Sequence, residues 1–192
     1  MDRADAFALL TEYVKDQGLI RHMLAVEAAM RTYARKFGED EGKWGLTGLM
    51  HDFDYERWPN PPDHPMKGSV ILRERGVSED VIYAILSHAD YLTAYPRVHP
   101  VDKALYACDE LAGFVTAAAL VRPGGITDMT AASVKKKMKS KGFARTVNRD
   151  DILRGAADFG VDLTVHIQFV IDAIKPLAPE LGLLQGLAGE GD

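Results

Sequence analysis

The feature that most constrains this chain is the helical spacing of its apolar residues, which continues along almost its whole length. Near the start, apolar side chains recur at three- and four-residue intervals, as in Phe7, Leu10 and Val14. These intervals place side chains on one face of an α-helix, whereas a half-buried strand needs strict alternation over several residues. The sequence has no alternating run of that length. It therefore predicts an all-α fold.

Proline and glycine divide this pattern into segments, because proline lacks an N–H donor and glycine often follows a helix end. Gly18 is expected to separate the first two helices, and WPNPPDHP, YPRVHP and RPGG to interrupt later ones. Further helices are expected at residues 41–50, 66–75, 78–88, 101–120, 130–139, 150–159 and 163–174. The sequence predicts a single domain over residues 1–192, with a core at about 19–121 and a helical extension at about 128–178. The glycine-rich end GLAGEGD is expected to fray.

Composition and charge exclude several classes of protein. A net charge of −5 argues against general nucleic-acid binding and against binding to membrane surfaces. No apolar stretch reaches the roughly 20 residues of a membrane span, and the acidic start MDRADAFALL is no signal peptide. The single cysteine, Cys108, excludes an internal disulfide and fits a reducing compartment. We therefore expect a cytoplasmic protein, and the oligomeric state is left open.

The strongest candidates for a chemical role are His51 and Asp52, in the stretch GLMHDFDYERW. An imidazole and a carboxylate together suit Mn, Fe, Co, Ni or Zn. Adjacent side chains diverge in the middle of a helix, but at a helix end the second residue leaves the helical path. Both side chains can then face one ion. The pair therefore indicates a metal site at the end of the helix expected at 41–50.

Two further polar residues interrupt apolar helix faces. His22 lies at the edge of the face in LIRHMLAVEAAM, and Asp109 lies within KALYACDELAGFVTAAAL. A buried carboxylate is costly unless it is paired or binds a cation. Taken singly, His22 could be a hydrogen-bonded core histidine, and Asp109 could pair with Lys103 or an arginine. Together with His51 and Asp52 they form a set that favours metal binding.

The order H…HD…D resembles the HD domain superfamily of metal-dependent phosphohydrolases. GLMHDFDYE looks like the HD segment of that family, and KALYACDELAGFVTA looks like the helix that brings its last aspartate. The later ALVRPGGITDMTAASVKKKMKSKGFARTVNRDDILRG is similar to a small single-domain bacterial subgroup, so the likeness covers about residues 19–177. The resemblance implies an HD-domain fold and a divalent ion (Mn, Fe, Co, Ni, Mg or Zn). Its ligands would be His22, His51, Asp52 and Asp109.

Three departures from the family pattern bear on the chemistry. Phe53 and Asp54 stand where many members carry Ile and Gly. Tyr55 stands where the deoxynucleotide 5′-phosphatase branch has a glutamate, which argues against a copy of that mechanism. The G-Y-P motif of the cyclic-dinucleotide branch is absent, so hydrolysis of cyclic di-GMP is not expected.

Other histidines and acids can extend the site. The placement of His64 and His88 resembles the extra ligands of bimetallic members, with Asp52 bridging two ions; they could instead bind water, phosphate or a metal-bound ligand. Asp52 is expected to serve catalysis as well as metal binding. Asp54, like Glu56, could give acid/base help, hydrogen-bond the histidines, or simply be solvated. His99 is expected in a loop, and His166 on a surface or satisfied within a helix, with no metal.

Basic residues supply candidate phosphate contacts. Lys103 lies six residues before Asp109 and could hold a phosphate oxygen or be exposed. The run SVKKKMKSKGFARTVNR could be a solvated helix face, or a basic wall that attracts substrate through Lys136 and Lys137. Arg122 is a further candidate, because its planar guanidinium suits phosphate.

These observations predict a phosphohydrolase that uses a metal-activated water on a small phosphorylated molecule, with nucleotides among the candidate substrates. Two alternatives remain. One is a sensor or partner protein that keeps metal and nucleotide binding without catalysis. The other is a di-iron oxygenase, which would need both His64 and His88 as ligands.

Overall fold

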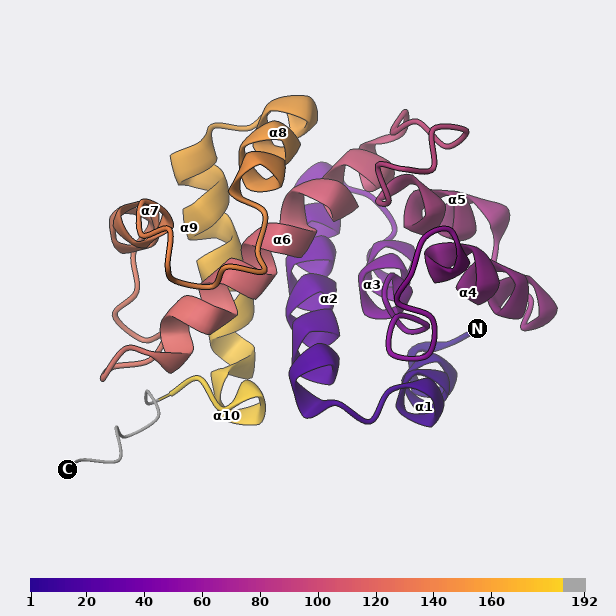
Figure 1. Ribbon diagram of the computed structural model, residues 1–192, viewed down its shortest axis with the longest axis horizontal. Coiled ribbons are helices and arrows are strands. Elements are labelled where there is room, and N and C mark those ends of the chain that lie inside the picture. Colours follow the sequence, from indigo (N-terminus) through magenta and orange to yellow (C-terminus); the bar gives the residue numbers. More distant parts are fainter. Residues whose placement is uncertain (185–192) are drawn as a thin grey trace. The chain divides into compact units, whose positions relative to one another are not determined.

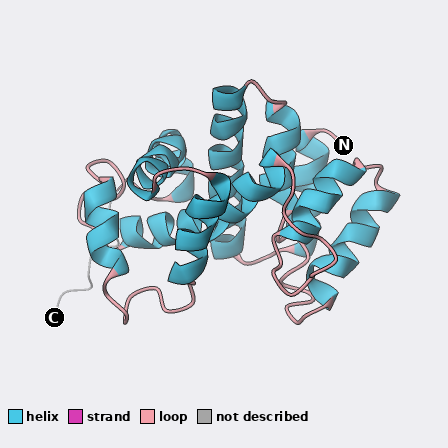
Figure 2. Ribbon diagram, turned by 90° about the horizontal axis from the view of Figure 1, so that it is seen from above, coloured by secondary structure: helices cyan, strands magenta, loops and turns pink. Residues whose placement is uncertain are grey.

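The computed structural model describes residues 1–184, and every regular element within them is a helix (Figure 1 and Figure 2). The prediction of an all-α fold is therefore confirmed. In chain order the elements are α1 (Arg3–Tyr13), α2 (Gln17–Phe37), α3 (Glu41–Met50), α4 (Asp63–Glu74), α5 (Glu79–Ser87), α6 (Pro100–Leu120), α7 (Ala131–Met138), α8 (Arg149–Phe159), α9 (Leu163–Ile174), the 3₁₀ helix η1 (Lys175–Leu177) and α10 (Ala178–Leu181). The segment GLAGEGD lies outside the described residues.

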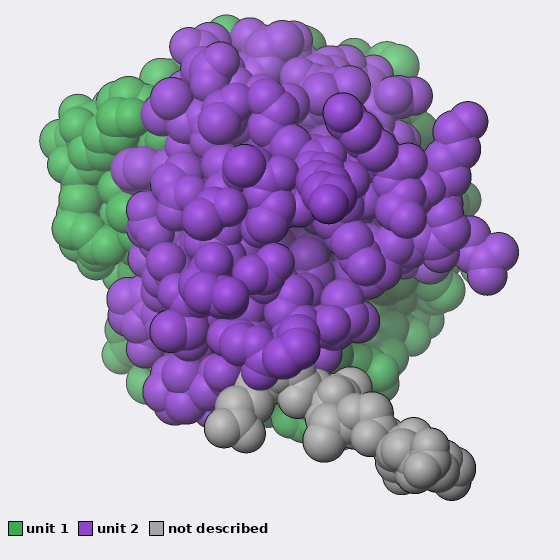
Figure 3. Space-filling view, turned by 90° about the vertical axis from the view of Figure 1, so that its left-hand side faces the viewer, with its two compact units in different colours: residues 1–106 green, residues 107–192 purple. Residues whose placement is uncertain are grey.

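The chain divides into two compact units, Met1–Tyr106 and Ala107–Asp192, which Figure 3 colours separately. The boundary falls inside α6, which begins in the first unit and ends in the second. The expected organisation, one domain with a core at about 19–121 and an extension at about 128–178, stays a prediction. None of the described helices combines the length and the hydropathy needed to cross a bilayer.

In the first unit, α3 contacts α1, α2 and α5, and α4 packs against α5. The approach of α2 to α3 depends on Gly48, since a Cβ at this position would lie 3.0 Å from the backbone N and Cα of Glu27. A side chain there would push against backbone atoms that cannot rotate away. Gly48 therefore allows the two helices that carry His22 and His51 to lie close together.

The start of α2 differs from the prediction that Gly18 separates the first two helices. Gly18 lies inside α2, and the break falls between Tyr13 and Gln17. The carboxylate of Asp16 accepts a hydrogen bond from the backbone N–H of Leu19 at 2.8 Å, so Asp16 is the N-cap. A good cap outweighs the roughly 1 kcal/mol that glycine costs within a helix.

Helix α4 opens irregularly. His64, with φ −84° and ψ 134°, and Pro65, with φ −90° and ψ 16°, do not have helical angles, although Asp63 is assigned to the helix start. A residue before proline is pushed out of the α region by the proline ring. WPNPPDHP therefore does interrupt the helix at His64, and the hydroxyl of Tyr91 donates to the carbonyl of His64 at 2.5 Å.

In the second unit, α9 contacts α7, α8 and η1. His166 of α9 is fully buried, and its Nε2 lies 2.8 Å from the carbonyl oxygen of Ala107, so it is a satisfied helix histidine rather than a surface one. The short elements η1 and α10 lie beyond the last helix that the sequence analysis predicted. Pro176 and Pro179 each stand in a first turn, where a missing N–H is tolerated.

Candidate metal centre

Four histidines of the first unit gather around the carboxylate of Asp52. His22 comes from α2, His51 and His88 are the C-cap residues of α3 and α5, and His64 lies at the irregular start of α4. Two helix ends and one helix start therefore present imidazoles to a single acid.

The two oxygens of Asp52 face different histidines. Oδ2 lies 3.6 Å from Nε2 of His51, whereas Oδ1 lies 3.2 Å from Nε2 of His64 and 3.4 Å from Nε2 of His88. Nε2 of His22 lies 3.3 Å from Nε2 of His51. Two three-residue groups result, His22–His51–Asp52 and Asp52–His64–His88, and within each group the ligand atoms lie within 4.8 Å of one another. Asp52 belongs to both groups.

Local hydrogen bonds define the tautomers of two of these histidines. Nδ1 of His51 lies 2.8 Å from the carbonyl oxygen of Gly48, and Nδ1 of His88 contacts the carbonyl oxygen of Ile85. A carbonyl only accepts, so in each ring Nδ1 carries the hydrogen and donates. The neutral rings therefore present the lone pair of Nε2 toward Asp52.

His64 is oriented by a buried acid. Its Nδ1 lies 2.7 Å from Oδ1 of Asp54, and Oδ2 of Asp54 accepts a hydrogen bond from the backbone N–H of Gly68 at 2.8 Å. Asp54 is fully buried, so it is not the solvated turn residue that its neighbourhood allowed. A Cβ at Gly68 would lie 2.7 Å from the Asp54 carboxyl group, so glycine is required there. With both oxygens engaged, Asp54 is placed to orient His64.

This donor set fits a transition-metal ion. Three imidazole nitrogens face the oxygens of Asp52 at 3.2 to 3.6 Å, and lone pairs repel one another unless a cation or protons lie between them. Imidazole with carboxylate suits Mn, Fe, Co, Ni and Zn, whereas Mg prefers sites built from oxygen alone. The histidine-rich set therefore favours a first-row transition ion over Mg.

Without metal, protons take the place of the cation. Burial lowers the pKa of His64, but its hydrogen bonds with Asp52 and Asp54 outweigh burial and raise that pKa to about 9. Burial raises the pKa of Asp52, but the charge of His51 and the hydrogen bonds from His64 and His88 hold it well below its usual range. The carboxylates of Asp52 and Asp54 thus stabilise positive charge at this position, as they would that of a bound cation.

The other candidates of the first unit have the following places. Glu56 accepts hydrogen bonds from the backbone N–H groups of Lys15 and Asp16, both at 2.9 Å, so it ties the HD segment to the start of α2. Lys103 is half-buried in the first turn of α6, and its phosphate contact stays a prediction. His99 precedes α6, and its Nδ1 lies 3.1 Å from the buried Asp102.

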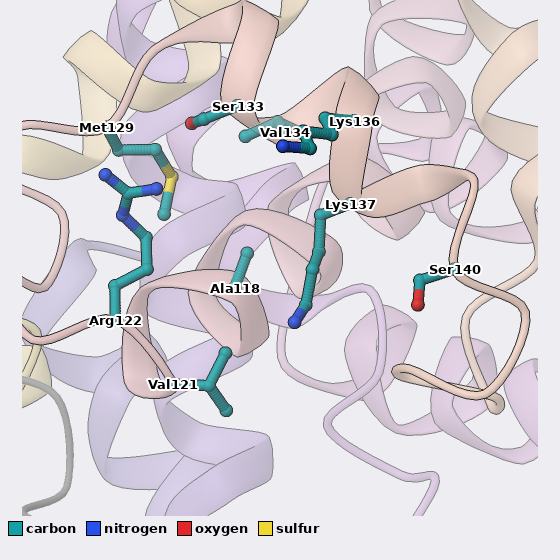
Figure 4. A pocket seen from close by; sticks show the side chains of 9 residues that line it. All are labelled: Ala118, Val121, Arg122, Met129, Ser133, Val134, Lys136, Lys137 and Ser140. Atoms are coloured by element: carbon teal, nitrogen blue, oxygen red, sulfur yellow. The ribbon is translucent and has the colours of Figure 1, made fainter.

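The remaining candidates belong to the second unit. Asp109 is half-buried on α6. Burial of the Cys108 thiol, together with the negative charge of Asp109, raises the pKa of Cys108. Its place among the metal ligands stays a prediction. Arg122, Lys136 and Lys137 are brought together, since all three line one cavity (Figure 4).

Sequence reasoning missed two residues that support His64. Gly68 is needed for its hydrogen bond and for its lack of a side chain, and Tyr91 donates to the backbone of His64. Tyr91 follows His88 by three residues, so its closeness to the histidines was open to prediction. Gly68 stands in an ordinary helical pattern and gave no comparable signal.

Comparison with known proteins agrees with this geometry. The family model of the HD domain matches residues 19–113, a span that includes every member of both metal-binding groups and Asp109. No solved structure matches the chain. The HD domain family consists mostly of metal-dependent hydrolases, and its members bind divalent metals. With its histidines and Asp52 arranged as described, this chain belongs to the HD domain superfamily.

Proposed function

We propose that the protein is a metal-dependent phosphohydrolase acting on a small phosphorylated molecule, with nucleotides among the candidate substrates. The observation that carries the proposal is the position of Asp52, with one oxygen toward His51 and the other toward His64 and His88. A carboxylate shared in this way would suit two neighbouring metal ions, one held with His22 and His51 and the other with His64 and His88. Sites with two neighbouring metal ions are common in enzymes that transfer a phosphoryl group to water.

When bound, a divalent ion lowers the pKa of a coordinated water toward ~7 and polarises a phosphoryl oxygen. The chain's own residues prepare the site for this. His51 and His88 are held in the tautomer that leaves Nε2 open, and Asp54 does the same for His64. The rings therefore need no reorientation when an ion binds, which lowers the entropic cost of binding.

Solvent access to the cluster also fits a hydrolase. The side chain of Asp52 is 18% exposed and His22 is half-buried, so the cluster reaches solvent at these two residues, whereas the side chain of His88 is 8% exposed. Tyr55 is exposed and its ring stands edge-on to that of His64, with the ring centroids 5.1 Å apart. We infer that substrate enters over Asp52 beside Tyr55, where an aromatic face is available to a flat group such as a base.

The proposal is tested by metal analysis followed by turnover. The protein is stripped with a chelator, reloaded with Mn, Co, Ni or Mg, and assayed against a panel of phosphomonoesters, phosphodiesters and nucleotides. Loading should be higher for the transition ions than for Mg, and at least one phosphoester should be hydrolysed. Failure to turn over any substrate while two ions are bound would favour the sensor alternative.

Single variants divide the site into its two groups. His22→Ala should remove the ion held with His51, and His88→Ala should remove the ion held with His64. His99→Ala is the matched control, because its imidazole is exposed and lies in the same unit. If His22→Ala and His88→Ala each retain two ions, the metal assignment is wrong.

The same shared carboxylate supports a second candidate, a di-iron oxygenase. That reading requires His64 and His88 to be ligands together, and both lie beside Oδ1 of Asp52. Iron content with a colour that changes on reduction and exposure to oxygen would identify it. Hydrolysis that proceeds equally well with redox-inert Zn would exclude it for the measured reaction.

A further inference from the structure

A cavity of about 470 Å³ lies within the second unit, and none of its lining residues belongs to the cluster around Asp52 (Figure 4). Its walls come from the end of α6, the segment after it, and α7 with the turn beyond. The lining residues are Ala118, Val121, Arg122, Met129, Ser133, Val134, Lys136, Lys137 and Ser140. A cavity of this size is typical of small-molecule sites, which are roughly 300–1,000 Å³ in volume.

One part of the lining is apolar and buried. Ala118, Met129 and Val134 are 3%, 1% and 1% exposed, and they supply methyl groups and a thioether. Figure 4 shows Ala118 between the side chains of Arg122 and Lys137. An apolar group placed against this surface would be removed from water, which is favourable by ~25 cal/mol per Å².

Apart from the exposed Val121, the rest of the lining is polar, and its only charges are positive. Arg122, Lys136 and Lys137 contribute cations, Ser133 and Ser140 contribute hydroxyl groups, and no acidic residue lines the cavity. Within the part of the chain that the structure describes, neither lysine has a carboxylate partner; Lys137 lies over the ring of Phe143, 4.3 Å from its centroid. Two lysines without a carboxylate partner, beside an apolar surface, favour a bound anion.

The guanidinium of Arg122 has one engaged and one unsatisfied hydrogen-bond donor. One of its terminal nitrogens donates to Oδ1 of Asp128 at 3.0 Å, whereas its Nε is buried and has no hydrogen-bond partner. A buried N–H group without an acceptor costs about 1–3 kcal/mol.

We propose that this cavity binds an amphipathic organic anion, a small molecule with a phosphate, sulfonate or carboxylate head and a compact apolar body. The head lies among Arg122, Lys136 and Lys137, and the body lies against Ala118, Met129 and Val134. Inorganic phosphate alone leaves the apolar surface unused, and a neutral apolar molecule leaves Lys136 and Lys137 without a counter-ion. The site stands apart from the proposed hydrolase activity, because it needs no metal.

The experiment uses the full-length protein stripped of metal, so that the cluster around Asp52 cannot hold an anion through an ion. The probe is anilinonaphthalene sulfonate, an aromatic anion whose fluorescence rises in apolar surroundings. Its uncharged counterpart, phenylnaphthylamine, reports the apolar contribution alone. We expect saturable binding of one sulfonate probe per chain, weaker at higher salt, and binding of the neutral probe at least about tenfold weaker.

Variants assign the binding to this cavity. Lys136→Gln with Lys137→Gln should weaken binding of the sulfonate about tenfold or more, since each charged hydrogen bond contributes a comparable factor. Lys139→Gln with Lys141→Gln is the matched control, because it removes the same charge from the same segment at positions that do not line the cavity. This control should change affinity by less than about twofold.

A gain of binding completes the test. Asp128→Asn removes the carboxylate that competes for Arg122, so the sulfonate probe should bind more tightly to this variant. Thermal unfolding of each variant checks that the fold is kept. Equal losses in the two double variants, or equal affinity for the charged and neutral probes, would overturn the proposal. So would weaker binding in the folded Asp128→Asn protein.

Discussion

Nδ1 of His64 lies 2.7 Å from Oδ1 of Asp54, and this hydrogen bond determines which nitrogen of His64 faces Asp52. The same carboxylate accepts a hydrogen bond from the backbone N–H of Gly68, so replacing either of its oxygens by an amide nitrogen would break a hydrogen bond. Asp54 therefore influences metal binding indirectly, by orienting the ligand His64.

Asp54→Asn should weaken the metal group formed by His64, His88 and Asp52. An asparagine cannot accept from both His64 and Gly68, because one of its two terminal atoms is a donor. Loss of such an orienting acid typically lowers metal affinity about 10–100-fold. Competition with a chelating dye measures the change. Asp63→Asn, which removes a solvent-accessible acid at the first residue of α4, should leave the metal affinity unchanged.

Metal-free protein should lose stability as the pH rises from about 6.5 to about 9. The pKa of His64 is raised from 6.5 to about 9 in the fold, so its protonated form adds stability that is complete below 6.5 and disappears as the pH passes 9. Thermal unfolding at a series of pH values after chelation measures this slope. Saturation with metal should flatten it, because the ion replaces the proton; a metal-free midpoint that rises over this interval would contradict the assignment.

Gly48→Ala should disturb both the fold and the metal centre. The new Cβ would lie 3.0 Å from the backbone of Glu27, so α2 and α3 must separate, at a cost of roughly 1–3 kcal/mol in the free energy of unfolding. The separation also draws His22 away from His51, so the variant should bind metal more weakly at this group. Denaturant unfolding measures the first effect and metal content the second. Gly142→Ala, where a Cβ meets no atom within 4 Å, is the control.

Asp109→Asn should reduce metal content if Asp109 completes the ligand set that the family resemblance implies. A carboxylate removed from a cation leaves positive charge uncompensated, which weakens binding. Glu110→Gln is the neighbouring control, because the glutamine oxygen can still accept from the backbone N–H of Asn148. Full metal content in a folded Asp109→Asn protein would assign Asp109 a structural role.

The helices were predictable because their signals are local. The segments expected at 41–50 and 163–174 occur with those bounds, and Asp40 and Asp162 cap their first turns. Gly18 misled because the competing signal, the capping acid Asp16, was not weighed against it. The prolines of η1 and α10 do not prevent these short helices, since proline breaks a helix only beyond its first turn.

The candidate site was predictable in part. His51 and Asp52 are adjacent in the sequence, so their grouping follows from one helix end. The roles of Asp54 and Gly68 depend on a contact across fourteen residues, between a turn and the next helix. The helical periodicity of the sequence does not indicate such a contact. Acids before a proline-rich turn are usually solvated, so the burial of Asp54 could be seen only in the structure.

The wide spacing of the residues around Asp52 has a consequence for how the protein acquires metal. During translation, His22 is synthesised early and His88 much later. The helices that carry them must pack before the two imidazoles lie near each other. A growing chain on the ribosome therefore has no complete site until His88 has emerged and the first unit has assembled. Any ion that these residues hold would therefore be bound late in maturation, after the first unit has folded, and the metal content of a preparation would then depend on how much of it has folded.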